Sequence, residues 1–369
     1  MPATTSAQDR KLDELAGACD RAPDELALFE EVSRRLNEVV PFDGACWFAT
    51  DPATVLAASA VRVENVERGH CESFWERECT VEDTILFRDV ARSASAIGTL
   101  YDATGDQPNR SARYREFLAP QGYGDELRAA FRLGESTWGV MDLYRDRTRA
   151  AFSAREVEQV RRVTPAVASA LRGFVARTKV SVGTDGPGTA LFDDRGRALS
   201  LDEQARVLFE EIGGPDWADR PLPMSPVFAV VARAAAVREG RDRGPASARL
   251  RSPSGRWLVV HASSLTGADG GAGPTALTIE PAKSAQMAPI IVEAYCLTAR
   301  EQDITHAVAR GMSNQEIAAA LFLSPHTVRD HLKAIFTKVG VGSRGEPVAK
   351  LFAEHYAPVL HTTYDHVDR

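Results

Sequence analysis

The sequence predicts a multi-domain protein in which two α+β domains precede a small all-α domain. Residues 24–178 show the order helix, strand, irregular helical segment, hairpin and helix, which is an α+β layout. Residues 189–282 show two strands, two helices and three strands. Residues 297–356 contain short helices with clear start and stop residues. A chain of 369 residues is long enough for two or three such domains.

The composition is that of a globular protein with an uneven charge distribution. Hydrophobic residues make up 44% of the chain and charged residues 26%, and the formal net charge is −7. Residues 290–350 nevertheless hold seven basic and six acidic side chains, so the acidic surplus lies before them. We expect phosphate-rich partners to meet the C-terminal part of the chain, because the acidic N-terminal part repels them.

The chain has no feature of a secreted or membrane protein. Its N-terminus is polar, and no apolar run approaches the roughly 18 residues that a membrane span needs. Five cysteines, at positions 19, 46, 71, 79 and 296, form no paired framework. We therefore expect a cytoplasmic protein without disulfide bonds and without membrane contact.

The first region begins after a lead-in, residues 1–23, that we expect to be disordered or frayed. A helix follows, because apolar residues recur at spacings of three and four between Leu26 and Leu36. Residues 45–48 predict a short buried strand, and Asp51-Pro52 predicts a turn. Residues 64–119 are irregular and mainly helical in pattern.

A β-hairpin and a long helix complete the first region. Residues 127–133 and 137–144 flank a Gly-Glu pair, which is a hairpin pattern. Alternation puts Asp142 on one face of the second strand, among apolar residues. Ser153 and Glu156 have the spacing of a capping box, so the helix runs from there to about residue 178.

Residues 179–188 are rich in glycine and small residues and predict a linker. The second region, residues 189–282, carries its own start and turn residues. Its predicted elements are a strand pair over 190–199, a helix capped by Ser200 and Glu203, an alanine-rich helix over 226–239, a hairpin around Ser254-Gly255, and a last strand over 275–279.

Residues 283–296 couple this region to the helical domain at 297–356, and residues 357–369 form a tail. Three helices are predicted, over 299–310, 314–321 and 325–339. Their starts are two capping boxes, Thr298 with Glu301 and Ser313 with Glu316, and the N-cap pair Ser324-Pro325. About three residues separate the second helix from the third, which is the spacing of a helix-turn-helix.

The third of these helices has two distinct faces. Val328, Leu332, Ile335 and Val339 form an apolar stripe. The other side is polar and carries His326, Arg329, Asp330 and Lys333. Such a helix suits insertion into the major groove, where Arg329 and Lys333 match guanine. Asp330 either accepts a hydrogen bond from cytosine or orients the two basic side chains.

This C-terminal segment resembles the LuxR-type (GerE-type) helix-turn-helix domain of bacterial regulators. The matching residues are the Leu-Thr-x-Arg-Glu opening at 297–301, Gly311, Ser313-Asn314, Glu316-Ile317-Ala318, Leu321, Ser324, Thr327-Val328, His331, Ile335, Lys338, Gly340-Val341 and Ser343-Arg344. The resemblance implies a four-helix domain that binds double-stranded DNA as a homodimer. It also implies phosphate contacts from Thr327, His331 and Lys338, with help from the helix N-terminus at Ser313 and Asn314.

Two further resemblances concern the N-terminal regions. By its layout and its Trp138-Gly139-Val140 strand, residues 24–178 resemble a GAF sensor domain, and the element order of residues 189–282 resembles a PAS domain. Both imply signal sensing, and whether either region binds a small molecule is left open. In the LuxR family the fourth helix commonly forms the dimer contact; here Pro347 falls within it, so that contact is also left open.

The residues do not favour an enzyme or a cofactor. No glycine-rich phosphate loop or nucleophile elbow is present. His70, Cys71 and Cys79 lack a fourth ligand and zinc spacing, so we interpret them as core or surface residues. We expect a transcriptional regulator whose partners are DNA, a second copy of the chain and, for an activator, RNA polymerase. The alternative is a ligand-binding or enzymatic module whose C-terminal helices serve only dimerisation.

Overall fold

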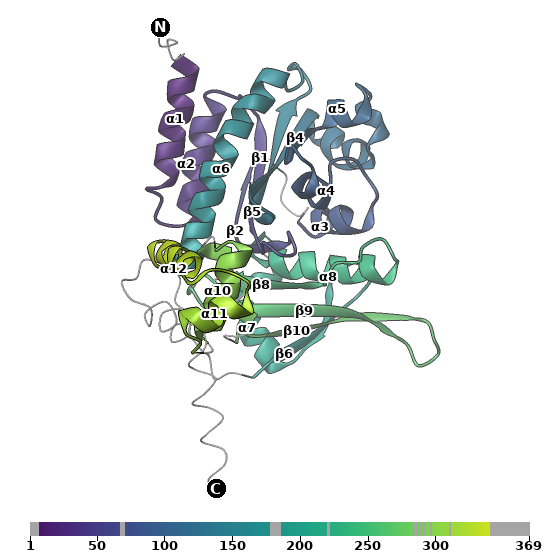
Figure 1. Cartoon of the computed structure of the whole chain (residues 1–369). Coiled ribbons are helices and arrows are strands. Elements are labelled where there is room, and N and C mark those ends of the chain that lie inside the picture. Colours follow the sequence, from purple (N-terminus) through teal and green to yellow (C-terminus); the bar gives the residue numbers. More distant parts are fainter. Residues whose placement is uncertain are drawn as a thin grey trace. The chain divides into compact units, whose positions relative to one another are not determined.

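The computed structural model describes residues 7–66, 71–177, 186–219, 222–283, 286–287, 290, 293–295, 297–309 and 311–339. The chain divides into two compact units, the first of residues 1–174 and 185–280, the second of residues 175–184 and 281–369. The first unit holds two five-stranded sheets, and the second holds helices (Figure 1). Two α+β regions followed by a helical region are thereby confirmed.

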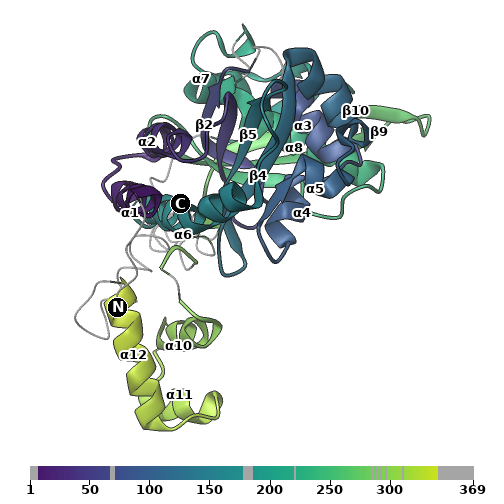
Figure 2. The same cartoon turned by 90° about the horizontal axis from the view of Figure 1, so that it is seen from above.

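The first sheet has the strand order β2-β1-β5-β4-β3. Its strands are β1 (Gly44–Thr50), β2 (Ala57–Glu64), β3 (Ile97–Thr99), β4 (Tyr123–Leu133) and β5 (Ser136–Asp146). Helices α1 (Ala7–Cys19), α2 (Glu25–Asn37) and α6 (Ala154–Arg177) cover one face, and α3 (Cys71–Thr80), α4 (Phe87–Arg92) and α5 (Leu100–Thr104) cover the other (Figures 1 and 2). The central strands are therefore buried on both faces.

The predicted hairpin and the start of α6 are confirmed. Strands β4 and β5 pair antiparallel from Tyr123–Asp146 to Leu133–Ser136. At the start of α6 the Ser153 amide donates to Glu156 Oε2 at 2.8 Å, and the Glu156 amide donates to Ser153 Oγ at 3.3 Å. Strand β2 was not predicted, because its first half, residues 57–60, consists of alanine and serine, which have low strand propensity, and only residues 61–64 alternate as a strand does.

The lead-in prediction for residues 1–23 is wrong for residues 7–19, which form α1. Leu12, Leu15 and Cys19 are buried on this helix. Arg162 of α6 pairs with Asp9, and Lys11 pairs with Glu38 at 3.0 Å. The apolar residues of α1 are few and separated by glycine and alanine, so its helical pattern is weak. Packing against neighbouring helices stabilises it instead.

A buried ionic cluster explains why Asp142 faces the core. Arg128 is fully buried and donates to Asp142 Oδ2 at 2.9 Å and to Glu78 Oε2 of α3 at 2.6 Å. Glu126 completes the cluster beside Arg113, at 2.6 Å. Burial alone would raise the pKa of Glu126, but the two guanidinium groups outweigh it and hold that pKa at about 2. Through the contact between Arg128 of β4 and Glu78, the cluster connects α3 to the first sheet.

The second sheet has the order β7-β6-β10-β9-β8. The observed elements are β6 (Gly188–Phe192), β7 (Ala198–Leu201), α7 (Glu203–Gly213), α8 (Ser225–Arg238), β8 (Ser247–Arg251), β9 (Trp257–Thr266) and β10 (Ala272–Pro281). The predicted order of two strands, two helices and three strands is confirmed. The predicted cap is wrong: Ser200 lies in β7, and Asp202 caps α7 by accepting from the Ala205 amide at 2.7 Å.

The two sheet regions pack together within the first unit. Helix α8 lies between α3 and β9 (Figure 1). Arg233 of α8 donates to the Thr54 carbonyl at 2.8 Å, and Arg249 of β8 forms a two-pronged ion pair with buried Asp51 at 2.7 and 2.8 Å. Most of the predicted linker at 179–188, and much of the coupling segment at 283–296, lie outside the described residues.

Candidate nucleic-acid interface

Three short helices of the second unit carry the predicted interface: α10 (Ala299–Ala309), α11 (Asn314–Ala320) and α12 (Pro325–Val339). Both predicted capping boxes are confirmed. The Thr298 amide donates to Glu301 Oε2 at 2.7 Å, and the Ser313 amide donates to Glu316 Oε2 at 2.7 Å. Gly311 follows α10 with a φ of 80°, the left-handed conformation that glycine favours at helix ends.

The turn between α11 and α12 determines where α12 begins and how its backbone enters the helix. Ser324 Oγ accepts from the Thr327 amide at 3.0 Å, so Ser324 is the N-cap of α12 as predicted. Phe322, in the same turn, combines a φ of 56° with a side chain that is 95% exposed. No sequence pattern predicts this conformation, because the backbone in a short turn depends on how the two helices pack.

The two faces of α12 are as predicted. Val328, Leu332, Ile335 and Val339 are all buried. Helix α12 contacts both α10 and α11 (Figure 2), so this buried stripe is the side that packs against them. The polar face remains exposed, and burial of the stripe fixes its orientation.

The three predicted base-reading residues, Arg329, Asp330 and Lys333, all lie exposed on α12. Asp330 Oδ2 lies 3.0 Å from Nδ1 of His326, one turn earlier. Within the described part of the chain, the side chains of Arg329 and Lys333 form no hydrogen bond or ion pair, although the Lys333 carbonyl accepts from Thr337 Oγ1 at 3.0 Å. The partner of Asp330 in this structure is therefore the histidine, and both basic side chains are available to a ligand.

The predicted phosphate-contacting residues occupy three places. Ser313 and Asn314 lie at the N-terminus of α11, where the helix dipole favours an anion. Thr327 and His331 are half-buried on α12. Lys338, near the end of α12, donates from Nζ to Glu301 Oε2 of α10 at 2.6 Å.

The sequence predicted a capping role for Glu301 but not its contact with Lys338. Its side chain is almost completely buried and accepts from both Thr298 and Lys338. Burial alone would raise the pKa of Glu301, but these hydrogen bonds outweigh it and hold the pKa below its ordinary value. The pair thus joins the start of α10 to the end of α12.

Comparison with known proteins identifies this unit. Residues 295–350 match the family described as bacterial regulatory proteins, luxR family. The C-terminal part of the chain is a LuxR-family domain. The transcriptional regulatory protein YhcZ of Bacillus subtilis is 47% identical over 62 residues, which are 17% of this chain and 28% of that protein. The probable regulator NarL of Mycobacterium tuberculosis is 35% identical over 68 residues, 18% of this chain and 29% of NarL.

The LuxR-family domain is where the sequence similarity lies, and the chain spans less than a third of the length of either relative. The chain also aligns with the crystal structure of a phage VqmA–DPO complex. The alignment covers 46% of this chain and 82% of the VqmA chain, at 20% sequence identity and a TM-score of 0.26. A score this low does not establish a shared fold for the N-terminal regions. The GAF-like and PAS-like interpretations therefore rest on the order of elements.

The described residues contain no cluster suited to a metal ion and no membrane-spanning helix. Among the described residues, no group of three or more His, Cys, Asp or Glu side chains is placed to hold a metal ion; His70 lies outside them. Cys46 and Cys79 are buried, and burial raises the pKa of Cys79 to about 12. In the part of the chain that the structure describes, no helix is long and apolar enough to span a bilayer.

Proposed function

We propose that the protein is a DNA-binding transcriptional regulator, not an enzyme, in which α12 enters the major groove. One observation carries the proposal. Burial of the apolar stripe against α10 and α11 leaves Arg329, Asp330 and Lys333 together on the exposed side of α12, within a LuxR-family domain. Arginine and lysine match guanine O6 and N7, and a carboxylate accepts from cytosine N4.

The proposed complex is a homodimer on an inverted repeat in the cytoplasm. A single recognition helix contacts few base pairs, so dimers read two half-sites about one helical turn apart. Ser313, Asn314, Thr327, His331 and Lys338 contact phosphates. RNA polymerase is a partner if the protein activates transcription. The segment around Pro347 that forms the dimer contact in the family lies outside the described residues.

The first unit is proposed to modulate DNA binding as a sensor, with GAF-like residues 24–178 and PAS-like residues 189–282. The order of elements in each region supports this. So does the packing of α8 against α3, because a change in one region is transmitted to the other through buried contacts. Two regions joined in this way form one input to the LuxR-family domain.

Selection from a random DNA pool with the full-length protein tests the proposal. We expect an inverted repeat to be recovered, two protomers per site, and an affinity that falls as salt rises. Lys338→Ala should weaken binding to all sequences alike and reduce the slope of log affinity against log salt by about one, because Lys338 is proposed to contact a phosphate. Lys11→Ala, on α1, removes the same charge from the first unit and should leave the slope unchanged.

Two outcomes contradict the proposal. One is the finding of a single protomer on one half-site at saturating protein, which would contradict the proposed dimeric complex. The other is an absence of any selected sequence together with a protein that still dimerises, which favours a module that uses its C-terminal helices only for dimerisation.

A further inference from the structure

A cavity of about 630 Å³ opens in the first unit where its two sheet regions meet. This volume lies within the range of small-molecule sites. The apolar part of the lining comes from α2, β2, the segment from the end of α7 to the start of α8, and β8 with its following turn: Leu26, Val61, Ile212, Pro223, Pro226, Leu250 and Pro253. Leu26 stands at its edge with 53% of its surface exposed, which is unusual for a large aliphatic side chain in this protein.

The polar part of the lining is predominantly acidic. Among the described lining residues, the charged side chains are Asp24, Glu25, Glu210 and Glu211 against a single arginine, Arg251. A low-dielectric cavity edged by one sign of charge attracts the opposite sign. A cavity lined by apolar side chains and by more acidic than basic groups therefore favours a ligand with an apolar body and a positive charge.

Glu25 differs from the other three carboxylates in how poorly it is paired. The others have close partners: Asp24 accepts from the Ala27 amide at 2.8 Å, Glu210 pairs with Arg206, and Glu211 accepts from Ser252 and Ser254 at 2.8 Å. The Glu25 side chain is only 13% exposed, and its ion pair within the described chain is with Arg251 at 3.4 Å. Charge-assisted hydrogen bonds are normally about 2.7–2.9 Å long. A largely buried carboxylate with one long contact has capacity for a closer cation.

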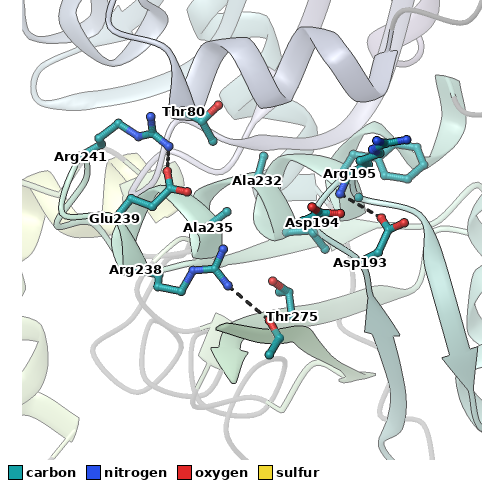
Figure 3. Close-up of a pocket in the computed structure, with 14 residues that line it drawn as sticks. Thr80, Asp193, Asp194, Arg195, Ala232, Ala235, Arg238, Glu239, Arg241 and Thr275 are labelled. Atoms are coloured by element: carbon teal, nitrogen blue, oxygen red, sulfur yellow. Dashed lines mark hydrogen bonds and ion pairs between the residues drawn. The ribbon is translucent and has the colours of Figure 1, made fainter. Parts of the chain in front are cut away.

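A second hollow in the first unit serves as a comparison, because its acidic and basic lining residues are equal in number. It measures about 260 Å³ and lies over α8 (Figure 3). Its charged lining residues balance, with three acidic and three basic side chains, Asp193, Asp194, Glu239, Arg195, Arg238 and Arg241. Several are engaged locally, as where Arg238 donates to the Gly273 carbonyl at 3.3 Å. This hollow has no preference for either charge, so the larger cavity is the stronger site.

We propose that the larger cavity binds a small organic cation with an apolar tail, such as a protonated alkylamine. The ammonium group pairs with Glu25, and the tail lies on Val61, Ile212 and Leu250. Glu25 belongs to the first sheet region and Arg251 to the second, so the ligand replaces an ion pair that joins the two regions. The inference deepens the proposed sensor role and rests on it for any effect on DNA binding.

Calorimetric titration of the full-length protein with three probes of equal chain length tests the site. The probes are n-octylamine, n-octanol and octanoate, which differ only in the charge of the head group. We expect octylamine to bind at least about tenfold more tightly than octanol, as a charge-assisted hydrogen bond implies. Octanoate should bind least. Equal binding of all three, tighter binding of octanoate, or no binding at all overturns the proposal.

Two substitutions with opposite expected effects on octylamine binding distinguish a direct effect at the cavity from loss of folding. Glu25→Gln should abolish the preference for octylamine over octanol. Arg251→Gln removes the competing cation and should tighten octylamine binding. Glu203→Gln, on α7 but outside the cavity, is the matched control and should change neither. If Glu25→Gln leaves the preference intact, Glu25 is not the cation's partner and the proposal fails.

The two proposals fail in distinguishable ways. DNA binding without any probe tests the regulator function alone, and probe binding without DNA tests the cavity alone. Octylamine should change the affinity of the full-length protein for its selected DNA, and Glu25→Gln should remove that change. Cavity binding with an unchanged DNA affinity overturns the link between the site and the sensor role.

Discussion

Asp330 is the least expected residue on the exposed face of α12, because a carboxylate repels phosphate. The structure places it 3.0 Å from His326 rather than beside Arg329 or Lys333. A face that served only to hold the DNA backbone would gain nothing from this side chain. We therefore retain a role in base readout for Asp330, and add His326 as the residue that positions it.

Asp330→Ala is expected to relax the preference at one base position without tightening binding to the selected site. Loss of one base contact reduces discrimination by about 1–3 kcal/mol at that position. Selection with the variant and with wild type measures the change position by position. Asp303→Ala removes an exposed carboxylate from α10 and should leave the preference unaltered. Uniformly tighter binding of Asp330→Ala to every sequence would mean that Asp330 is only a repulsive charge.

At the scale of elements, the contact between Glu301 and Lys338 links the first and third helices of the second unit. It joins α10 to α12 across 37 residues of sequence, at 2.6 Å. It also engages the ammonium group that the sequence assigned to DNA phosphate. The structure thus gives Lys338 a structural role in the free protein, and its phosphate contact remains a prediction.

Glu301→Gln is expected to destabilise α10 and α12 by about 1–3 kcal/mol, because the almost completely buried side chain at this position loses its charged hydrogen bond with Lys338. The pKa of Glu301 is lowered by folding. Its contribution to stability is therefore present above the ordinary glutamate pKa and is lost as pH falls through the lower folded pKa. Hydrogen exchange of α12 amides in the full-length protein, at neutral pH and below pH 4, measures both effects.

A second capping-box glutamate provides the control for that experiment. Glu316 caps α11 through Ser313 but is exposed. Glu316→Gln should therefore destabilise its helix less than Glu301→Gln. Equal losses for the two variants would show that capping, not the pair with Lys338, accounts for the effect.

At the scale of the whole molecule, the charge is separated along the chain. Residues 1–289 hold 36 basic and 42 acidic side chains, whereas residues 290–350 hold seven and six. We therefore expect the second unit, rather than the acidic first unit, to supply the affinity for DNA. This agrees with a chain that separates into two compact units close to the same boundary.

Residues 281–369 alone are expected to bind DNA with the same base preference as the full chain but more weakly, if the first unit contributes to dimerisation. Fluorescence anisotropy with the selected site at low salt measures the affinity of both proteins. Circular dichroism of the fragment confirms that its helices form. A folded fragment that fails to bind DNA at low salt contradicts the assignment of the interface to α11 and α12.

The sequence by itself determined the features that depend on residues close together in the chain. Capping boxes, N-caps and helical or alternating periodicity involve side chains one to four positions apart, so α10, α11, α12, the hairpin of β4 and β5, and the element order of the second region were all predicted. The stripe of α12 fixed which face is exposed, and hence where Arg329, Asp330 and Lys333 lie. Local rules also misled where two caps competed, at Ser200 and Asp202.

Only the tertiary structure decided the features that depend on residues far apart. Helix α1 and edge strand β2 have weak patterns and are stabilised by packing. Asp51 and Arg249 are 198 residues apart, and no spacing rule connects them. The same holds for Glu25, whose single long contact with Arg251 marks the cavity. An ionised side chain in a folded protein pairs with whichever partner the packing of the elements brings near, and that packing is a property of the whole chain.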